Sequence, residues 1–303
     1  MRSLGKCFVT SLVSVLLPFL PILASQRTVA QVTSNVFERV LNVRVNGDTK
    51  HEGIATAFTI DVDGREYLIT AKHVVQGLKD KDKIDVYMND GWSPLAVDIF
   101  RCEDPVDIAV LIPPHQLTVG FDLPFEKETF FVGQDAYFLG FPYGIQSPAH
   151  GINGPYPMAL VKRGTISGIV PINLEKKVGL VLLDGYNNPG FSGGPIVFRD
   201  LNQGGVVFDL MGVISGFKPE VVPVMKEHDI ASPADAGSAA KAQPWKIKKR
   251  SDGTYFEYVE NDTYVALNTG IVLGYGIDPA IALIRQHPTG PEVKDLPNNT
   301  PSK

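Results

Sequence analysis

Ser192 lies in the segment NNPGFSGGPIVF (187–198), in which glycine occupies positions 190, 193 and 194. A serine hydroxyl attacks a carbonyl carbon well only when a neighbouring base takes its proton, and backbone N–H groups must stabilise the resulting negative oxygen. Glycine permits the tight turn that presents such N–H groups. The segment therefore makes Ser192 a candidate nucleophile for acyl transfer, although an incidental serine in a hairpin turn would look similar.

Two other residues have the side chains that such a nucleophile needs. His73 follows the apolar run in EYLITAKHVV, and Asp107 directly precedes the apolar run in EDPVDIAVLI. An imidazole can take and return the serine proton, and a carboxylate can hold that imidazole in the right tautomer. The nearby acids Glu103 and Asp104 do not directly precede the apolar strand, so we expect them to be solvated.

The glycine turn around Ser192 fits two different folds, and the rest of the chain distinguishes them. In α/β-hydrolases the Gly-x-Ser-x-Gly turn leads into a helix, and the histidine follows the serine. Here the turn leads into PIVF, a β-branched run that disfavours a helix. The histidines after Ser192 are His228, in a charged stretch, and His287, beside a proline near the end. The order His73, Asp107, Ser192 on strand ends is the better interpretation.

The elements that position these residues are predicted to be strands. After residue 35 the chain consists of short β-branched and aromatic runs separated by Gly, Pro, Asn and Asp. This pattern indicates antiparallel sheets that form sandwiches or barrels. Near the end, DPAIALIRQ (278–286) begins with Asp-Pro and continues with an apolar face, which predicts a short helix.

Five motifs in this order resemble the trypsin-like (chymotrypsin-fold) serine proteases, and among them most closely the HtrA/Deg type. The similar segments are LITAKHVV, VDIAVL, YFLGFPYG, VKRGTISG and DGYNNPGFSGGPIV, and the resemblance covers roughly residues 40–287. It implies two antiparallel six-stranded β-barrels, an N-terminal one over about 35–125 and a C-terminal one over about 130–277. A short C-terminal helix over 278–287 would complete a protease domain of residues 31–287.

The resemblance also implies roles for individual residues. His73, Asp107 and Ser192 would form the catalytic triad, and the backbone N–H groups of Gly190 and Ser192 would form the oxyanion hole. The pocket for the substrate residue before the scissile bond would be lined by Tyr186, Ile214, Ser215, Gly216 and Phe217. Because Tyr186 replaces an acidic residue, we expect small or medium apolar side chains there.

The chain departs from its relatives in two respects. Phe191 stands where digestive relatives have an aspartate that receives a new N-terminus, so activation by that route is not expected. About 85 residues follow the segment GVISGF, and the last strand and helix use many of them, so we expect no PDZ domain.

Composition limits the possible partners and the compartment. The 303 residues are 44% hydrophobic with a net charge of -5, which fits a globular protein and argues against nucleic-acid binding. Residues 1–30 combine basic residues, an apolar run and small residues, which predicts a signal peptide rather than a retained anchor. Cys102 would be the one cysteine left after its removal, so no internal disulfide is expected. These features predict export to a bacterial periplasm or the extracellular space, with no stable membrane insertion.

Two segments are predicted to lie outside the regular fold. Residues 218–262 are rich in charge and in Ala, Pro and Asp, and are interpreted as an insertion or long loop. Residues 288–303 are predicted to form a disordered tail. The oligomeric state cannot be inferred from the sequence.

The sequence thus predicts an exported serine endopeptidase that acts on proteins or peptides through an acyl-enzyme. It predicts no cofactor and no metal. Two alternatives stay open: an inactive protease-fold scaffold that binds peptides, and an esterase with the same triad.

Overall fold

The computed structural model describes residues 32–45, 53–118, 123–125, 130–147, 153–173, 178–199, 208–236 and 247–294. The predicted signal peptide (1–30) lies outside these residues. Among the described residues, no helix is long and apolar enough to cross a membrane.

The first half of the described chain forms one antiparallel sheet with the order β5-β4-β1-β2-β3-β7-β6. The central strands β2 and β3 are buried along almost their whole length, because successive side chains point to opposite faces and each face packs into a different core cluster. Short helical turns flank it. The bounds are α1 (Ser34–Phe37), β1 (Val40–Arg44), β2 (Ile54–Val62), β3 (Arg65–Thr70), η1 (Lys72–Val75), β4 (Lys83–Met88), β5 (Gly91–Ala96), β6 (Asp98–Arg101) and β7 (Ala109–Ile112).

The second half forms another antiparallel sheet with the order β10-β9-β8-β11-β12-β14-β13, and β10 also pairs with β14. That pairing closes six strands into a barrel, to which β13 is added. The bounds are β8 (Asp135–Gly140), η2 (Pro142–Gly144), β9 (Leu160–Asn173), β10 (Val178–Asp184), β11 (Pro195–Arg199), β12 (Phe208–Ile230), η4 (Pro233–Asp235), β13 (Lys248–Lys249) and β14 (Tyr255–Gly276).

The predicted all-β fold with a short C-terminal helix is confirmed, with one correction to its strand count. Each sheet has seven strands among the described residues, where six were predicted. In the second sheet the additional strand is β13, which pairs with β14 at Tyr255 and Phe256, beyond the closed barrel.

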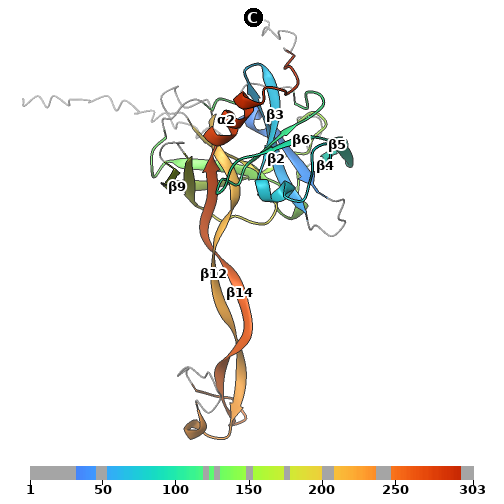
Figure 1. Ribbon diagram of the computed structural model, residues 1–303. Helices are drawn as coiled ribbons and strands as arrows, with labels where there is room; N and C mark the ends of the chain where they lie inside the picture. The colour runs from blue at the N-terminus through green and yellow to red at the C-terminus, as the bar shows by residue number, and fades with distance from the viewer. Residues whose placement is uncertain are drawn as a thin grey trace, which may run out of the picture. The chain divides into compact units, whose positions relative to one another are not determined.

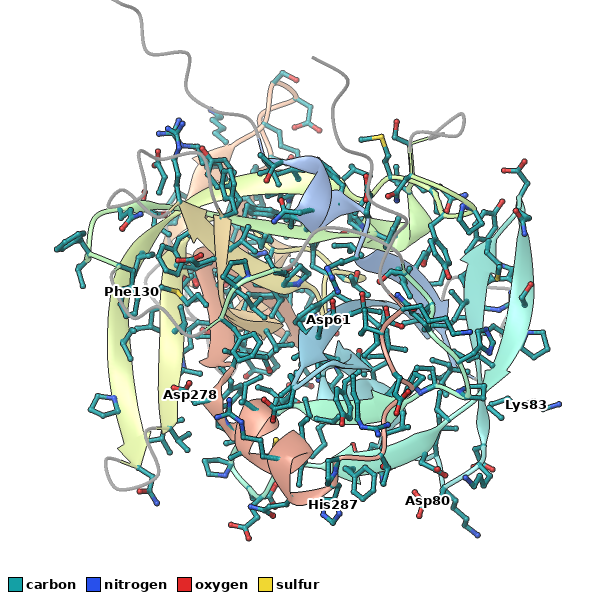
Figure 2. All side chains as sticks on the ribbon, turned by 90° about the horizontal axis from the view of Figure 1, so that it is seen from above. Asp61, Asp80, Lys83, Phe130, Asp278 and His287 are labelled. Carbon is teal, nitrogen blue, oxygen red and sulfur yellow. The ribbon has the colours of Figure 1, made fainter. Side chains whose placement is uncertain are left out.

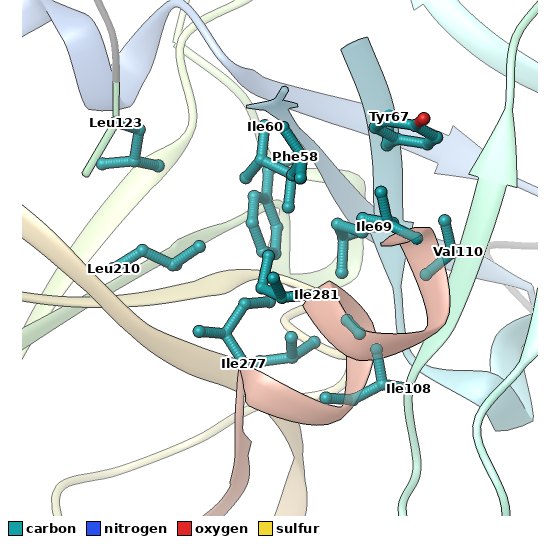
Figure 3. Close-up of a cluster of buried hydrophobic side chains, with 14 of the residues drawn as sticks. Phe58, Ile60, Tyr67, Ile69, Ile108, Val110, Leu123, Leu210, Ile277 and Ile281 are labelled. Atoms are coloured by element: carbon teal, nitrogen blue, oxygen red, sulfur yellow. The ribbon is translucent and has the colours of Figure 1, made fainter. Parts of the chain in front are cut away.

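The core of the molecule has three parts. Each sheet packs one cluster of buried residues of its own. A third, larger cluster contains residues of both sheets. In this third cluster Phe58 and Ile69 of the first sheet lie with Leu210 of the second sheet and with Ile277, which directly follows β14 (Figure 3). Helix α2 (Asp278–Gln286) adds Ile281 to it, and Figure 2 labels its first residue, Asp278, and His287, which directly follows the helix.

Strands β12 and β14 continue far beyond the barrel as a two-stranded ribbon (Figure 1). Their pairing runs from Gly212 and Gly276 to Ile230 and Tyr255, with bulges on the way. The insertion or long loop predicted for residues 218–262 is therefore largely regular β-structure. Neither face of the ribbon is buried along most of its length, so its sequence lacks the alternation that identifies a strand.

The end of the described chain is attached to the first sheet. Pro291 accepts a hydrogen bond of 2.9 Å from the backbone of Glu66, and Gly290 accepts one of 2.6 Å from Arg65. Val293 donates to Gly64 at 3.0 Å. The prediction of a disordered tail is therefore wrong for residues 288–294. This segment is held through its backbone groups, so its side-chain composition could not predict that it is ordered.

Candidate active site

His73 and Asp107 come from neighbouring strands of the first sheet. His73 lies in η1, directly after β3, and Asp107 lies just before β7; β3 and β7 pair with Thr70 opposite Ala109. Asp107 Oδ2 is 2.7 Å from His73 Nδ1, and Asp107 Oδ1 accepts a hydrogen bond of 2.9 Å from the His73 backbone. A neutral imidazole that donates from Nδ1 keeps Nε2 as a proton acceptor. The carboxylate thus fixes both the backbone and the ring of His73.

The Asp107 carboxylate has a third donor from the second sheet. Ser215 Oγ donates to Asp107 Oδ2 at 2.6 Å, across 108 positions of sequence. Burial alone raises the pKa of Asp107, but the hydrogen bonds from His73 and Ser215 outweigh it and bring the pKa below its ordinary value. Asp107 is therefore ionised at neutral pH. The sequence placed Ser215 in the substrate pocket and could not indicate this contact.

Ser192 lies on the turn between residue 186 and β11, and its backbone is tied to both sheets. Its carbonyl accepts a hydrogen bond of 2.9 Å from Thr56 of β2, and its hydroxyl donates to the Ser215 carbonyl at 3.3 Å. Ser215 therefore connects Ser192 with the Asp107–His73 pair. Among the described residues no hydrogen bond joins the Ser192 hydroxyl to His73. Bonds of this kind are often long before substrate binds and shorten in the complex.

Two glycines of the turn occupy positions that no other residue could take without strain. Gly190 has φ +102° and Gly193 has φ +85°. A Cβ on Gly193 would lie 2.1 Å from the Thr56 carbonyl oxygen, and one on Gly190 would lie 2.4 Å from that of Phe141. Both contacts are with backbone, which cannot move aside cheaply. Close packing of the turn against the two sheets thus requires glycine.

The backbone of the turn has two N–H groups at and beside Ser192 that could act as donors. The Pro189 carbonyl accepts a hydrogen bond of 2.9 Å from the Tyr143 backbone. In a trans peptide the N–H points away from the carbonyl, so the Gly190 N–H is directed away from Tyr143. Within the described part of the chain, neither the Gly190 nor the Ser192 N–H has a hydrogen-bond acceptor. Two such donors could stabilise an oxyanion.

The residues predicted to line the substrate pocket differ in their exposure and in their contacts. Tyr186 is 57% exposed, whereas Ile214 is fully buried in the core of the second sheet. Gly216 and Phe217 follow on β12 and pair with β14. The buried Asn187 was not predicted; its Nδ2 donates to the Gly216 carbonyl at 2.9 Å and so ties the nucleophile turn to β12.

Lys162 on β9 is another residue that sequence reasoning missed. Its ammonium donates a hydrogen bond of 2.5 Å to the Tyr186 carbonyl and another to Asn188 Oδ1. Both acceptors belong to the turn that leads to Ser192. In the sequence Lys162 stands beside Arg163 in a strand, which is typical of a solvated face and gives no signal of such a contact.

Two further observations concern groups that could bind a metal ion or react as a thiol. Within the described ranges, no group of three or more His, Cys, Asp or Glu side chains could hold a metal ion. Burial raises the pKa of the Cys102 thiol to about 11, so this thiol stays protonated and unreactive at neutral pH.

Comparisons with known proteins concern the same region. The family model of the trypsin-like peptidase domain matches residues 55–207. No curated protein sequence matches the chain.

Two similar solved structures are proteases. The HtrA-type protease AlgW with a tripeptide has a TM-score of 0.48 and 18% identity, over 84% of this chain and 61% of that one. A mutant of Rv3671c from M. tuberculosis H37Rv, in its inactive form, has a TM-score of 0.41 and 18% identity, over 85% of this chain and 90% of that one. The chain thus spans less than two thirds of the length of AlgW.

Proposed function

Because this chain belongs to the family of trypsin-like peptidase domains, we propose that it is a serine endopeptidase with His73, Asp107 and Ser192 as its catalytic residues. The family assignment confirms the resemblance seen in the sequence. One observation carries the finer proposal. A continuous series of hydrogen bonds runs from His73 through Asp107 and Ser215 to Ser192, and it joins residues of both sheets.

In the proposed mechanism the imidazole of His73 takes the hydroxyl proton as Ser192 Oγ attacks the scissile carbonyl carbon. The carbonyl oxygen becomes negative and accepts hydrogen bonds from the N–H groups of Gly190 and Ser192. His73 then gives its proton to the leaving amine, which yields an acyl-enzyme that water hydrolyses by the reverse steps. Asp107 holds the imidazole and stabilises its charged form throughout.

The proposed substrates are proteins or peptides in an extended conformation. The segment Ser215–Phe217 lies beyond the last β11 partner on β12, which is Val213, so a substrate strand could pair along it. Pairing of this kind gives affinity with little sequence preference. If residues 1–30 are a signal peptide, these substrates are exported proteins.

A fluorophosphonate probe tests the proposal, because it reacts only with an activated serine. We expect labelling of Ser192, with a loss of about 10³-fold or more in Ser192→Ala and His73→Ala. Ser167→Ala is the matched control, since this exposed serine hydrogen bonds only within β9, to the Thr165 carbonyl.

The outcomes separate the three candidate functions. Labelling together with cleavage of an unfolded protein such as casein supports the peptidase. Labelling with cleavage of simple esters but not of peptides supports an esterase. A folded wild-type protein that never labels would mean a binding scaffold and would contradict the proposal.

A further inference from the structure

Lys162 has an unusual set of contacts for a lysine on a strand. It lies opposite Phe138 in the β8–β9 ladder, and its side chain reaches the turn that precedes the nucleophile. There its ammonium donates to the Tyr186 carbonyl (2.5 Å) and to the side-chain oxygen of Asn188. One cation therefore holds a backbone group and a side chain of the same turn.

The same ammonium also contacts the aromatic rings of the turn. It lies 5.3 Å from the ring centroid of Phe191 and 5.5 Å from that of Tyr186. Phe191 directly precedes Ser192 and is fully buried. A cation at this distance from a ring is attracted to its face, more strongly where water is excluded. Lys162 is thus bound to three of the six residues before Ser192.

The charge of Lys162 is not neutralised by a carboxylate. Across the described ranges, no Asp or Glu lies within ion-pair distance of its ammonium. Arg163, the next residue, instead makes an ion pair of 2.7 Å with Asp135. Burial lowers the pKa of Lys162, which means that the charged form loses hydration here. Its hydrogen bonds to the turn and its ring contacts are the interactions that the charged form makes in place of water.

The other half of the turn is held by residues of other elements. Tyr143 N–H binds the Pro189 carbonyl and Thr56 Oγ1 binds the Gly190 carbonyl at 2.7 Å. These bonds set the direction of the Gly190 N–H only while the preceding residues stay in place. Lys162 binds those preceding residues, Tyr186 and Asn188.

We infer that Lys162 is a positioning residue whose ammonium holds the turn 186–191 in the conformation that directs the Gly190 N–H toward the developing oxyanion. This inference rests on the proposed peptidase function. Lys162 acts through the turn and does not touch the substrate. Its positive charge also lies beside the turn whose amides would receive the negative charge of the transition state.

The test compares Lys162→Met, which keeps the length of the side chain, with Lys162→Arg, which keeps the charge. We expect Lys162→Met to lower kcat by about 10- to 100-fold, because small displacements of catalytic groups have effects of this size, with KM within about twofold. Affinity for a peptide aldehyde, whose adduct carries an oxyanion, should fall by the same factor. Affinity for the product peptide should not change.

Lys162→Arg should recover most of the lost kcat, whereas Arg163→Met is the matched control and should leave kcat unchanged. If Lys162→Met does not fold, Asn188→Ala removes one acceptor of the same ammonium and should lower kcat and aldehyde affinity together. The inference fails if the folded variants keep wild-type kcat and aldehyde affinity, or if product affinity falls equally. Wild-type protein that does not react with the fluorophosphonate would instead refute the peptidase function itself.

Discussion

Strand β12 consists of two parts that differ in burial. The inner part of β12, Phe208–Ile214, is buried throughout and pairs with β11 on one side and β14 on the other. The outer part, Pro219–Asp229, pairs with β14 alone and is half-buried or exposed. Ser215 and Gly216, which contact the candidate site, lie between the two parts. The candidate site thus lies where the buried barrel becomes an exposed ribbon.

The difference shows that a regular hydrogen-bond ladder does not by itself indicate a stabilising core. Isolated two-stranded ribbons are marginally stable in water because neither face is buried. In the outer part Val221 is 62% exposed and Tyr264 is 61% exposed, whereas Val213 in the inner part is fully buried. Substitutions in the inner part should therefore change the free energy of unfolding strongly, and substitutions in the outer part should change it little.

The largest effect is expected from Gly212→Ala in the inner part. A Cβ at this position would lie 2.2 Å from the backbone oxygen of Tyr275, so the two strands would have to separate. We expect a loss of about 1–3 kcal/mol in the free energy of unfolding, the usual result of overpacking, measured by urea denaturation. Gly216→Ala is the control, because a Cβ there has no neighbour within 4 Å. Equal losses in both variants would contradict the comparison.

An intermediate effect is expected at the junction, where Ser215 meets Asp107. Because the folded state lowers the pKa of Asp107, its ionised form stabilises the fold above the unfolded pKa, and this contribution disappears as pH falls through the folded pKa. Asp107→Asn should therefore be less stable than wild type at pH 7, with the difference shrinking below about pH 4. Urea denaturation across this pH range measures it. A difference that is constant or grows toward acid would exclude the lowered pKa.

The smallest effect is expected from Val221→Ser in the outer part. Because this side chain is 62% exposed, the free energy of unfolding should change by no more than about 0.5 kcal/mol. Fluorophosphonate labelling of Ser192 should not change. A loss above about 1 kcal/mol would show that this face of the ribbon is covered in solution.

The strand pattern and the closing helix could be predicted from the sequence because the strands are short β-branched and aromatic runs between turn residues, and Asp278-Pro279 begins a helix. The outer ribbon could not be predicted in the same way. Residues such as Pro219, Pro223 and Lys226 interrupt any alternation, and no buried face imposes one. The attached segment 288–294 escaped prediction because its contacts are made largely by backbone groups.

Within the candidate site, some residues could also be predicted from the sequence and others could not. His73, Asp107 and Ser192 stand in local motifs, so each could be identified from its neighbours in the chain. Their catalytic roles stay predictions. The bonds from Ser215 to Asp107 and from Lys162 to the turn join residues far apart in sequence, and no local pattern encodes them.

Thr56 links the two sheets at the turn that carries Ser192. Its amide donates to Ser192, its hydroxyl donates to Gly190 and accepts from Phe141, and its carbonyl accepts from Thr70 at 2.8 Å. The amide proton of Thr56 can therefore exchange with deuterium only when the turn detaches from the first sheet. Its exchange rate therefore measures how often the turn that carries Ser192 detaches from the first sheet, in the resting protein and without any substrate.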